Sequence, residues 1–167
     1  HSGKYNQGYQ SIAIGNKSGN SNQGYQSIAI GDHSGKYNQG NYSISNGFDA
    51  GNTKQGNYSI ACGFKSGKYN QRDNSISLGN QAGYTEQGNN SVAIGNKAGY
   101  TGQHNNTIIL NASGSELNSI DTDGFYVKPI KPSNSTENLF QLYYDAETWQ
   151  IFYINTSAVS SEFTSAK

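Results

Sequence analysis

The stretch SIAIGNKSGNSNQGYQ, Ser11 to Gln26, is followed directly by SIAIGDHSGKYNQGNY, Ser27 to Tyr42. A Ser or Thr opens each unit of sixteen residues, and an Ile or Val follows it. The opening residues are Ser11, Ser27, Ser43, Ser59, Ser75, Ser91 and Thr107. Self-similarity at a fixed period is typical of a chain that stacks one structural unit on itself. We therefore expect a repeat structure rather than a domain built around one core.

The repeated segment SIAIG predicts a short strand. Its apolar side chains alternate with small ones, which is the period-two pattern of a half-buried strand. A unit of sixteen residues is too short for a βαβ unit, which needs about 30 residues. We therefore predict an all-β parallel β-roll, or β-solenoid, whose coils each hold two short strands and two turns. Residues 1–10 continue the same pattern, so we expect further coils upstream.

Two apolar ladders run down the stacked units, and we expect both to face inward as the structural core. The first ladder is Ile12, Ile28, Ile44, Ile60, Ile76, Val92 and Ile108. The second is Ile14, Ile30, Asn46, Cys62, Leu78, Ile94 and Leu110. A glutamine also recurs in every unit, from Gln7 to Gln103, and we expect these amides to form hydrogen-bonded ladders between coils.

The composition indicates an ordered chain that associates with copies of itself. Hydrophobic residues make up 32% of the sequence, against about 45–50% in typical globular proteins. Disordered chains combine high net charge with few aromatic residues, whereas this chain has zero formal net charge and 13 tyrosines. Because the repeats contain too few large apolar side chains for a conventional core, we expect subunit association to supply the missing burial.

Several classes of function lack support in the sequence. No apolar run is long enough to span a bilayer, so we expect no membrane insertion. Cys62 is the only cysteine, and no catalytic, phosphate-binding or zinc motif is present, so we expect no catalytic residue, metal or cofactor. Residues 1–106 carry eight Lys/Arg and four Asp/Glu, an excess too small to predict a nucleic-acid partner.

The unit N-x-S-[IV]-A-I-G-x-x-[AS]-G, over residues 11–110, resembles the head repeat of trimeric autotransporter adhesins, the YadA-like type. Its sixteen-residue form with an NQG turn also resembles fibre proteins of phages and large DNA viruses. The resemblance implies a left-handed β-roll in which three chains form one rod. It further implies a homotrimeric attachment fibre, on a virion surface or alternatively a bacterial cell surface, that binds a host cell-surface glycan or glycoprotein.

The period ends near residue 110, so we predict a repeat shaft at 1–110 and a β-rich trimerisation or tip domain at 111–167. GFYVKPI, Gly124 to Ile130, reads as a strand. FQLYYDAETWQIFYI, Phe140 to Ile154, reads as a β-hairpin with its turn at Asp145 to Thr148. The residues expected to form this cap are Phe125, Tyr143, Trp149 and Phe152.

The middle coils depart from the repeat and offer a candidate binding patch. Phe48 and Phe64 replace the Asn or Asp of other units, and Tyr42 and Tyr58 form a second pair. One interpretation is a coil repacked around an inward Asn46, and the other is an aromatic patch that stacks on sugar rings. Lysines in two repeat positions form basic stripes that are either solvated edges or an anionic-glycan track. These are Lys4, Lys36 and Lys68, and Lys17, Lys65 and Lys97.

An alternative function is a polysaccharide-degrading enzyme of the tailspike type. Glycoside hydrolysis uses two carboxyl groups about 5–9.5 Å apart. Asp32 and Asp49 lie on adjacent predicted coils, and Asp121 and Asp123 flank a predicted turn. Either pair would serve if it lined a groove between subunits. The sequence Asp121-Thr-Asp-Gly also fits ordinary turn chemistry.

Overall fold

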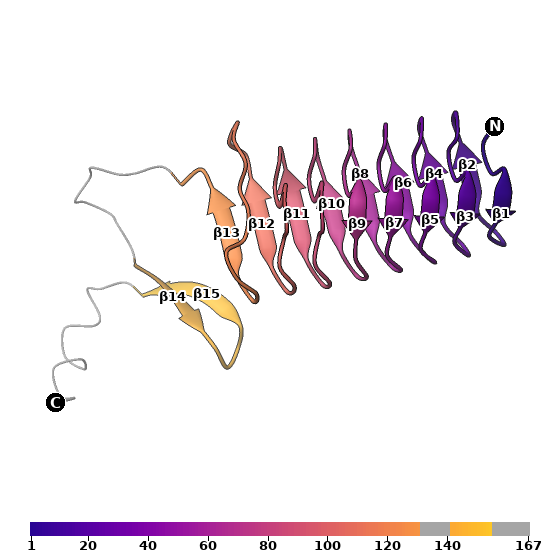
Figure 1. Cartoon of the computed structure of the whole chain (residues 1–167). Helices are drawn as coiled ribbons and strands as arrows, with labels where there is room; N and C mark the ends of the chain where they lie inside the picture. Colours follow the sequence, from indigo (N-terminus) through magenta and orange to yellow (C-terminus); the bar gives the residue numbers. More distant parts are fainter. Residues whose placement is uncertain (131–140, 155–167) are drawn as a thin grey trace, which may run out of the picture. The chain divides into compact units, whose positions relative to one another are not determined.

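The computed structural model describes residues 1–130 and 141–154, and in the second range the side chains of residues 142–151. The chain divides into two compact units, His1–Ile130 and Lys131–Lys167. The first unit is a parallel β-solenoid of about eight coils of about 16 residues (Figure 1). No helix occurs in the described residues. The predicted β-solenoid is therefore confirmed.

The SIAIG segments build one parallel sheet along the whole solenoid. Its strands follow the order β13-β12-β11-β10-β8-β6-β4-β2, and successive coils pair in register, as in Ile12↔Ile28 and Ile14↔Ile30. The strands are β2 (Ile12–Ile14), β4 (Ile28–Ile30), β6 (Ile44–Asn46), β8 (Ile60–Cys62), β10 (Ile76–Leu78), β11 (Val92–Gly95), β12 (Ile108–Asn111) and β13 (Phe125–Lys128).

A second parallel sheet, in the order β1-β3-β5-β7-β9, uses the segments around the recurring glutamine. The strands are β1 (Tyr5–Gln7), β3 (Ser21–Gln23), β5 (Tyr37–Gln39), β7 (Thr53–Gln55) and β9 (Tyr69–Gln71). The central residue of each strand has a positive φ, for example 55° at Asn22 and 54° at Asn38. Asparagine tolerates this left-handed conformation better than most residues, which explains its recurrence at the position.

Small side chains and glutamines fill the space between the two sheets. Ala29, Ser45, Ala61, Ser77 and Ala93, the central residues of their strands, are fully buried. Of the residues that open the units, Ser11 is half-buried and the others are fully buried, and these are Ser27, Ser43, Ser59, Ser75, Ser91 and Thr107. Because each coil holds strands of only three or four residues, the two sheets enclose a narrow interior. Alanine and serine fit this space, and isoleucine is excluded from most of it.

The two apolar ladders lie on the outside of the coil, so the prediction that they face inward is wrong. In the second ladder Ile14 is 58% exposed, and Ile30, Leu78 and Ile94 are exposed as well. The first ladder is exposed at both ends, at Ile12 and Ile108. Its middle members are half-buried, and these are Ile28, Ile44, Ile60, Ile76 and Val92. In the second ladder Asn46 is exposed, and Cys62 and Leu110 are half-buried.

The reason for this error is that period-two alternation identifies two faces of a strand but does not say which face is inner. Here the width of the coil decides, because the interior accepts Ala and Ser. Ile109 is the one member of the inner series that is large, and it is fully buried at the C-terminal end, in a cluster with Ala82, Ala93 and Ala98.

The recurring glutamines do not bond to one another, as the sequence suggested, but to backbone carbonyls. The Nε2 of Gln23 donates to the carbonyl of Ile12 at 2.7 Å, and that of Gln39 donates to Ile28 at 2.7 Å. The amide ladder forms instead on the outer surface, where Asn6 donates to Asn22 and Asn22 donates to Asn38, each at 2.9 Å. Each inner glutamine therefore joins the two sheets of a coil.

Two of the buried glutamine oxygens accept a hydrogen bond from a serine at the inner strand position, and that of Gln39, beside Ala29, accepts one from Ser27 Oγ at 3.5 Å. Ser45 Oγ donates to Gln55 Oε1 at 2.5 Å, and Ser77 Oγ donates to Gln87 Oε1. Where alanine takes the serine position, at Ala61 and Ala93, the Oε1 atoms of Gln71 and Gln103 are buried without a partner. The inner strand residue is thus one of the groups that can satisfy this buried acceptor.

The glycines that end the SIAIG strands combine a special backbone with close packing. Gly31 has φ of 124°, and a Cβ at this residue would lie 2.6 Å from the carbonyl oxygen of Gly47 in the next coil. Side-chain-bearing residues rarely adopt this conformation. A residue with any side chain would therefore strain the turn and separate the coils.

The solenoid continues beyond residue 110, where the sequence placed the end of the shaft. That boundary lies inside β12, and β13 adds a further parallel strand with the register Ile108↔Phe125 and Leu110↔Val127. Phe125 and Val127 are exposed, so they extend the two outer ladders. Phe125, which we expected in the cap, therefore belongs to the shaft.

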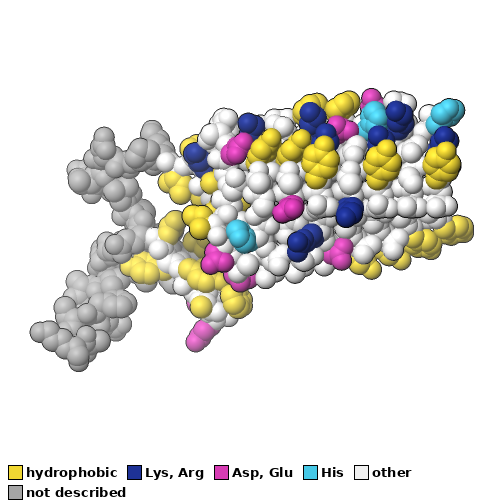
Figure 2. Space-filling view, in the orientation of Figure 1, with side chains coloured by type: hydrophobic (Ala, Val, Ile, Leu, Met, Phe, Trp, Pro, Cys, Tyr) yellow, Lys and Arg dark blue, Asp and Glu magenta, His cyan; other side chains and the backbone are white. Residues whose placement is uncertain are grey.

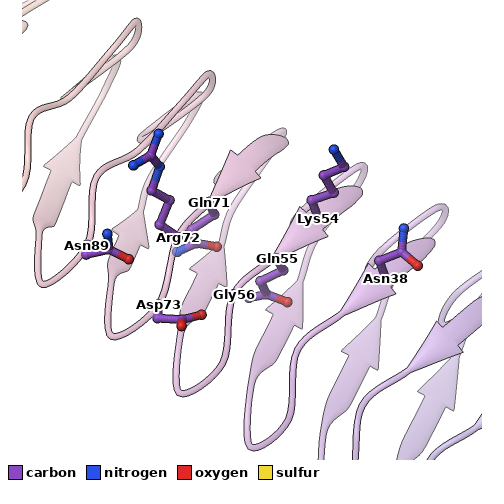
Figure 3. Close-up of a pocket in the computed structure, with 8 residues that line it drawn as sticks. All are labelled: Asn38, Lys54, Gln55, Gly56, Gln71, Arg72, Asp73 and Asn89. Carbon is purple, nitrogen blue, oxygen red and sulfur yellow. The ribbon is translucent and has the colours of Figure 1, made fainter.

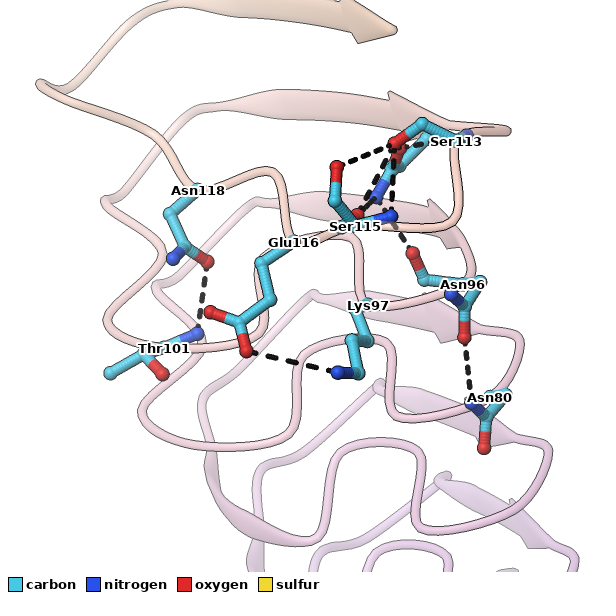
Figure 4. Close-up of polar contacts among 9 residues, drawn as sticks. Asn80, Asn96, Lys97, Thr101, Ser113, Ser115, Glu116 and Asn118 are labelled. Atoms are coloured by element: carbon cyan, nitrogen blue, oxygen red, sulfur yellow. Dashed lines mark hydrogen bonds and ion pairs between the residues drawn. The ribbon is translucent and has the colours of Figure 1, made fainter.

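Residues 112–119 lie along residues 96–104 of the preceding coil (Figure 4). The backbone N–H of Gly99 donates to the carbonyl of Leu117 at 2.8 Å, and that of Thr101 donates to Asn118 Oδ1 at 3.0 Å. Lys97 and Glu116 are 3.9 Å apart. An open last coil would leave unpaired strand edges, and this segment satisfies part of that edge within the chain.

The described part of the second unit is an antiparallel hairpin of β14 (Gln141–Asp145) and β15 (Gln150–Ile154). Asp145 Oδ1 accepts hydrogen bonds from the backbone N–H of Glu147 and Thr148, at 2.8 and 3.1 Å. Hydrogen bonds from the side chain and backbone of Thr148, and then from Glu147, lower the pKa of Asp145.

The predicted hairpin and turn are confirmed. Of the residues expected to form the cap on this hairpin, the structure describes the side chains of Tyr143 and Trp149. Trp149 is 75% exposed, and Tyr143 is also exposed. Phe140, and the side chain of Phe152, lie outside the described residues.

Replacing Gly31 by alanine tests the packing of the coils. Because the new Cβ meets the backbone of the next coil, we expect a loss of about 2–4 kcal/mol in unfolding free energy. Gly114→Ala is the matched control, since a Cβ there has no atom within 4 Å. Chemical denaturation followed by circular dichroism measures both, and equal stability of the two variants would contradict the proposed packing.

Exchanging serine and alanine in the interior tests the glutamine acceptors. Ser77→Ala leaves Gln87 Oε1 buried without its donor, and we expect a loss of about 1–3 kcal/mol. Ala61→Ser supplies a donor for Gln71 Oε1, and we expect a gain of about 0.5–1.5 kcal/mol. Opposite signs in denaturation experiments support the account, whereas a stabilising Ser77→Ala refutes it.

Candidate functional site

The aromatic residues of the middle coils form two stacked pairs at opposite ends of the same strands. The rings of Tyr42 and Tyr58 stack with centroids 5.2 Å apart and 3° between planes. Those of Phe48 and Phe64 stack at 5.5 Å and 12°. The tyrosine pair precedes β6 and β8, and the phenylalanine pair follows them. The structure therefore arranges the four predicted residues as two separate pairs and not as one cluster.

The tyrosine pair belongs to a longer row that the sequence analysis missed. Tyr9 and Tyr25 stack at 5.8 Å, and Tyr25 meets Tyr42 edge-on at 5.7 Å. These four residues form what we call the tyrosine row. The row is hidden in the sequence because Tyr25 and Tyr42 are seventeen residues apart, which breaks the sixteen-residue register. The sequence signal for the tyrosine row is this shift of one residue between the turns that hold Tyr25 and Tyr42.

The phenylalanine pair is framed by polar groups. The ring of His33 contacts Phe48 edge-on at 6.5 Å between centroids. Lys65 Nζ lies 4.8 Å from the centroid of Phe64. Both phenylalanine rings are exposed, so each offers a ring face or edge to a ligand.

The aromatic pairs flank an apolar surface. We call the exposed side of the eight-stranded sheet, formed by the two outer ladders together with Phe125 and Val127, the outer apolar face. Figure 2 shows a largely polar face of the solenoid, bordered by rows of hydrophobic side chains; the outer apolar face is defined by the exposure of its own members. Asn46 lies on this face, so the idea that the aromatic residues compensate for an inward Asn46 loses its basis.

The lysines of the first predicted stripe rest on aromatic rings. Lys4 lies 4.6 Å from the ring centroid of Tyr5, and Lys36 lies 4.6 Å from that of Tyr37. Lys68 bonds to Asp49 at 2.9 Å. Burial acts to lower the pKa of Lys68, but hydrogen bonds to Asp49 and Tyr69 outweigh it and raise the pKa overall. These contacts favour a structural role for the stripe.

The carboxylates considered for catalysis each have their own partners. Asp32 Oδ1 lies 2.7 Å from Nδ1 of His33, and Asp49 is bonded to Lys68. Asp121 Oδ1 accepts from the backbone N–H of Thr122 at 2.7 Å, and Asp123 Oδ2 accepts from its hydroxyl at 3.0 Å. The second pair therefore shows the turn chemistry that its sequence predicted. In the part of the chain that the structure describes, no group of three His, Cys, Asp or Glu is placed to hold a metal ion.

Comparison with protein families supports the resemblance seen in the repeat. The family model for the YadA head domain repeat, in two copies, matches residues 87–98. The chain therefore carries a YadA-like head repeat. Neither the curated proteins nor the solved structures give a match.

The repeat and the β-solenoid fit an adhesin-like fibre. Proteins of the YadA-like kind are structural, surface-exposed and typically homotrimeric adhesins. Among the described residues, no helix has the length and apolar character needed to cross a membrane.

Proposed function

We propose that this chain is part of a homotrimeric attachment fibre that projects from a virion or bacterial surface and binds host cell-surface glycans or glycoproteins. The observation that carries the proposal is the outer apolar face, whose apolar members one chain leaves exposed or half-buried from β2 to β13. Monomeric proteins rarely expose contiguous apolar patches larger than a few hundred Å². A face of this extent therefore calls for a partner surface.

Three copies of the same chain provide that surface. The ladders of the outer apolar face follow straight rows with in-register pairing, so identical chains can pack side by side over the full length of the rod. Closed cyclic symmetry is the usual arrangement of identical subunits. The typical homotrimeric state of YadA-like adhesins favours three copies over two.

The aromatic pairs are the candidate glycan sites of this fibre. Tyr42, Tyr58, Phe48 and Phe64 are all exposed, and flat rings suit the apolar faces of sugar rings. Three copies of each pair per rod would raise the apparent affinity through effective concentration. Each individual site can therefore be weak and still support attachment.

The hairpin is the candidate trimerisation cap. Leu142, Tyr144, Trp149 and Ile151 are exposed in the described residues of the second unit. An isolated two-stranded hairpin is at best marginally stable in water. Burial of Tyr143, Trp149 and Phe152 between three chains would supply the stabilisation that it needs.

Substitution on the outer apolar face tests the trimer. Ile94→Asp places one buried carboxylate per chain in the proposed interface, and we expect this to weaken assembly by at least about 3 kcal/mol, or roughly 100-fold. The single chain should stay folded because Ile94 is exposed in it. Asn70→Asp on the other sheet is the control and should leave the trimer intact. Light scattering measures the mass, and an Ile94→Asp variant that remains trimeric would refute the interface.

Substitution of the aromatic pairs tests the glycan sites. Tyr58→Ala and Phe64→Ala remove one ring from each pair, and we expect at least one of them to reduce binding on a glycan array about tenfold or more. Tyr100→Ala is the control, since Tyr100 stacks on Tyr84 away from both pairs. Unchanged glycan binding in both test variants would remove the aromatic pairs as receptor sites.

A further inference from the structure

A polar groove lies on the outer surface of the five-stranded sheet, which is the other sheet of the coil from the outer apolar face. Figure 3 shows its lining residues, which include Asn38, Lys54, Arg72, Asp73 and Asn89. Its volume is about 300 Å³, at the lower end of the range for small-molecule sites. When the outer apolar face is covered by sister chains, this groove can remain open to solvent.

The first of three repeat patterns ends in this groove. The outer asparagine ladder runs from Asn6 through Asn22 to Asn38 with bonds of 2.9 Å. Lys54 occupies the next position. Within the described residues, the Nδ2 of Asn38 therefore lacks the amide acceptor that the same group finds in earlier coils.

The second pattern is a series of side-chain acceptors at the neighbouring turn. Oδ1 of Asn41 accepts from the backbone N–H of Tyr25 at 2.8 Å, and Oδ1 of Asp73 accepts from that of Asn57 at 2.7 Å. The series then skips Asn89, whose side chain has no hydrogen-bond partner among the described residues. It resumes at Asn105, which accepts from the backbone of Asn89 at 2.8 Å.

The third pattern is a glycine series that Arg72 interrupts. Glycine takes this position at Gly8, Gly24, Gly40, Gly56 and Gly88. A Cβ at Gly40 would lie 2.3 Å from the carbonyl oxygen of Gly56, so a side chain here needs a wider gap between coils. The backbone bond from Arg72 to Gln87 is 3.1 Å, against 2.7 Å from Gly56 to Gln71. The missing bond to Asn89 falls at this same turn.

Two cations project into the region where these patterns end. Lys54 and Arg72 come from adjacent coils, and their side chains extend to the same side in Figure 3. In the described parts of the chain neither has an ion-pair, hydrogen-bond or ring partner for its charged group, unlike Lys68 with Asp49 and Lys36 with Tyr37. Glu86 lies beyond Arg72 and lines the adjoining grooves with it.

We propose that this groove binds an acidic sugar of a host glycan, with the sugar carboxylate between the Lys54 ammonium and the Arg72 guanidinium. An arginine fork matches a carboxylate with two parallel hydrogen bonds. The Nδ2 of Asn38 and the amide of Asn89 donate to sugar hydroxyls, and the second oxygen of Asp73 accepts from them. The carboxylates of Asp73 and Glu86 balance the charges of Lys54 and Arg72. Binding of the sugar therefore depends on the position of its carboxylate and hydroxyls, and a uniformly charged polyanion is disfavoured.

This inference deepens the proposed attachment function and rests on it for the presence of three grooves per rod. The groove lies on a different surface from the aromatic pairs, so loss of binding at one site should not affect binding at the other. Tyr58→Ala is expected to leave the groove's affinity unchanged, and loss of the groove is expected to leave the aromatic pairs intact.

The experiment titrates the whole chain with an oligogalacturonate and with the same oligomer after reduction of its carboxyl groups, by calorimetry. We expect the acidic oligomer to bind and the reduced one to bind at least tenfold more weakly. Lys54→Gln and Arg72→Gly should each weaken binding of the acidic oligomer about tenfold. Arg72→Gly restores the residue found in other coils, so it should fold at least as well as the original chain.

Lys17→Gln is the control, because it removes the same charge at another corner of the coil and should bind as the original chain does. Equal binding of the acidic and reduced oligomers would overturn the carboxylate site. So would equal weakening by Lys17→Gln, which would indicate attraction by net charge alone. Absence of any binding of the acidic oligomer, with aromatic-pair binding on the glycan array retained, would overturn the groove and leave the attachment function standing.

Discussion

The narrow space between the two sheets of a coil constrains the rest of this structure. Strands of three or four residues, joined by tight turns, leave room for Ala, Ser and the side chain of one Gln per coil. Such an interior buries little apolar surface, and hydrophobic stabilisation scales with the apolar area removed from water. The coils are instead held by backbone bonds between neighbouring coils and by glutamines that bond to carbonyl oxygens.

The same constraint moves the large apolar side chains to the outside. The ladders of Ile, Val and Leu then form a long face that one chain cannot cover, and this links the width of the coil to assembly. In-register stacking also produces straight rows of identical groups, such as the Asn6–Asn22–Asn38 ladder and the tyrosine row. Residues that break these rows give the surface its candidate binding sites.

The sequence predicts the coil length, the strands and the corners, because each depends on local pattern. The SIAIG segments form strands in the predicted register, and the hairpin turn at Asp145 to Thr148 is present. It does not predict the inner face, since alternation at Ile12, Ala13 and Ile14 is symmetrical with respect to the two sides of the sheet. The extension to β13 is also hidden, because Phe125 follows Ile108 by seventeen residues.

The candidate sites show a similar division. The aromatic residues were identified as departures from the repeat, yet their separation into two pairs depends on where each corner lies in three dimensions. The groove at Lys54 and Arg72 was missed because each residue looks like an isolated surface substitution in the sequence. Lys54 and Arg72 each replace the usual residue of a repeat position, and only the stacking of coils places both in the lining of one groove.

The solution mass of the unmodified chain, measured by sedimentation equilibrium at micromolar concentration, tests the central claim most directly. If the narrow interior forces the apolar ladders outward for burial by sister chains, the mass will be three times that of the 18.0 kDa chain. A folded species with the mass of one chain would show that the ladders are stable in water and would contradict the account.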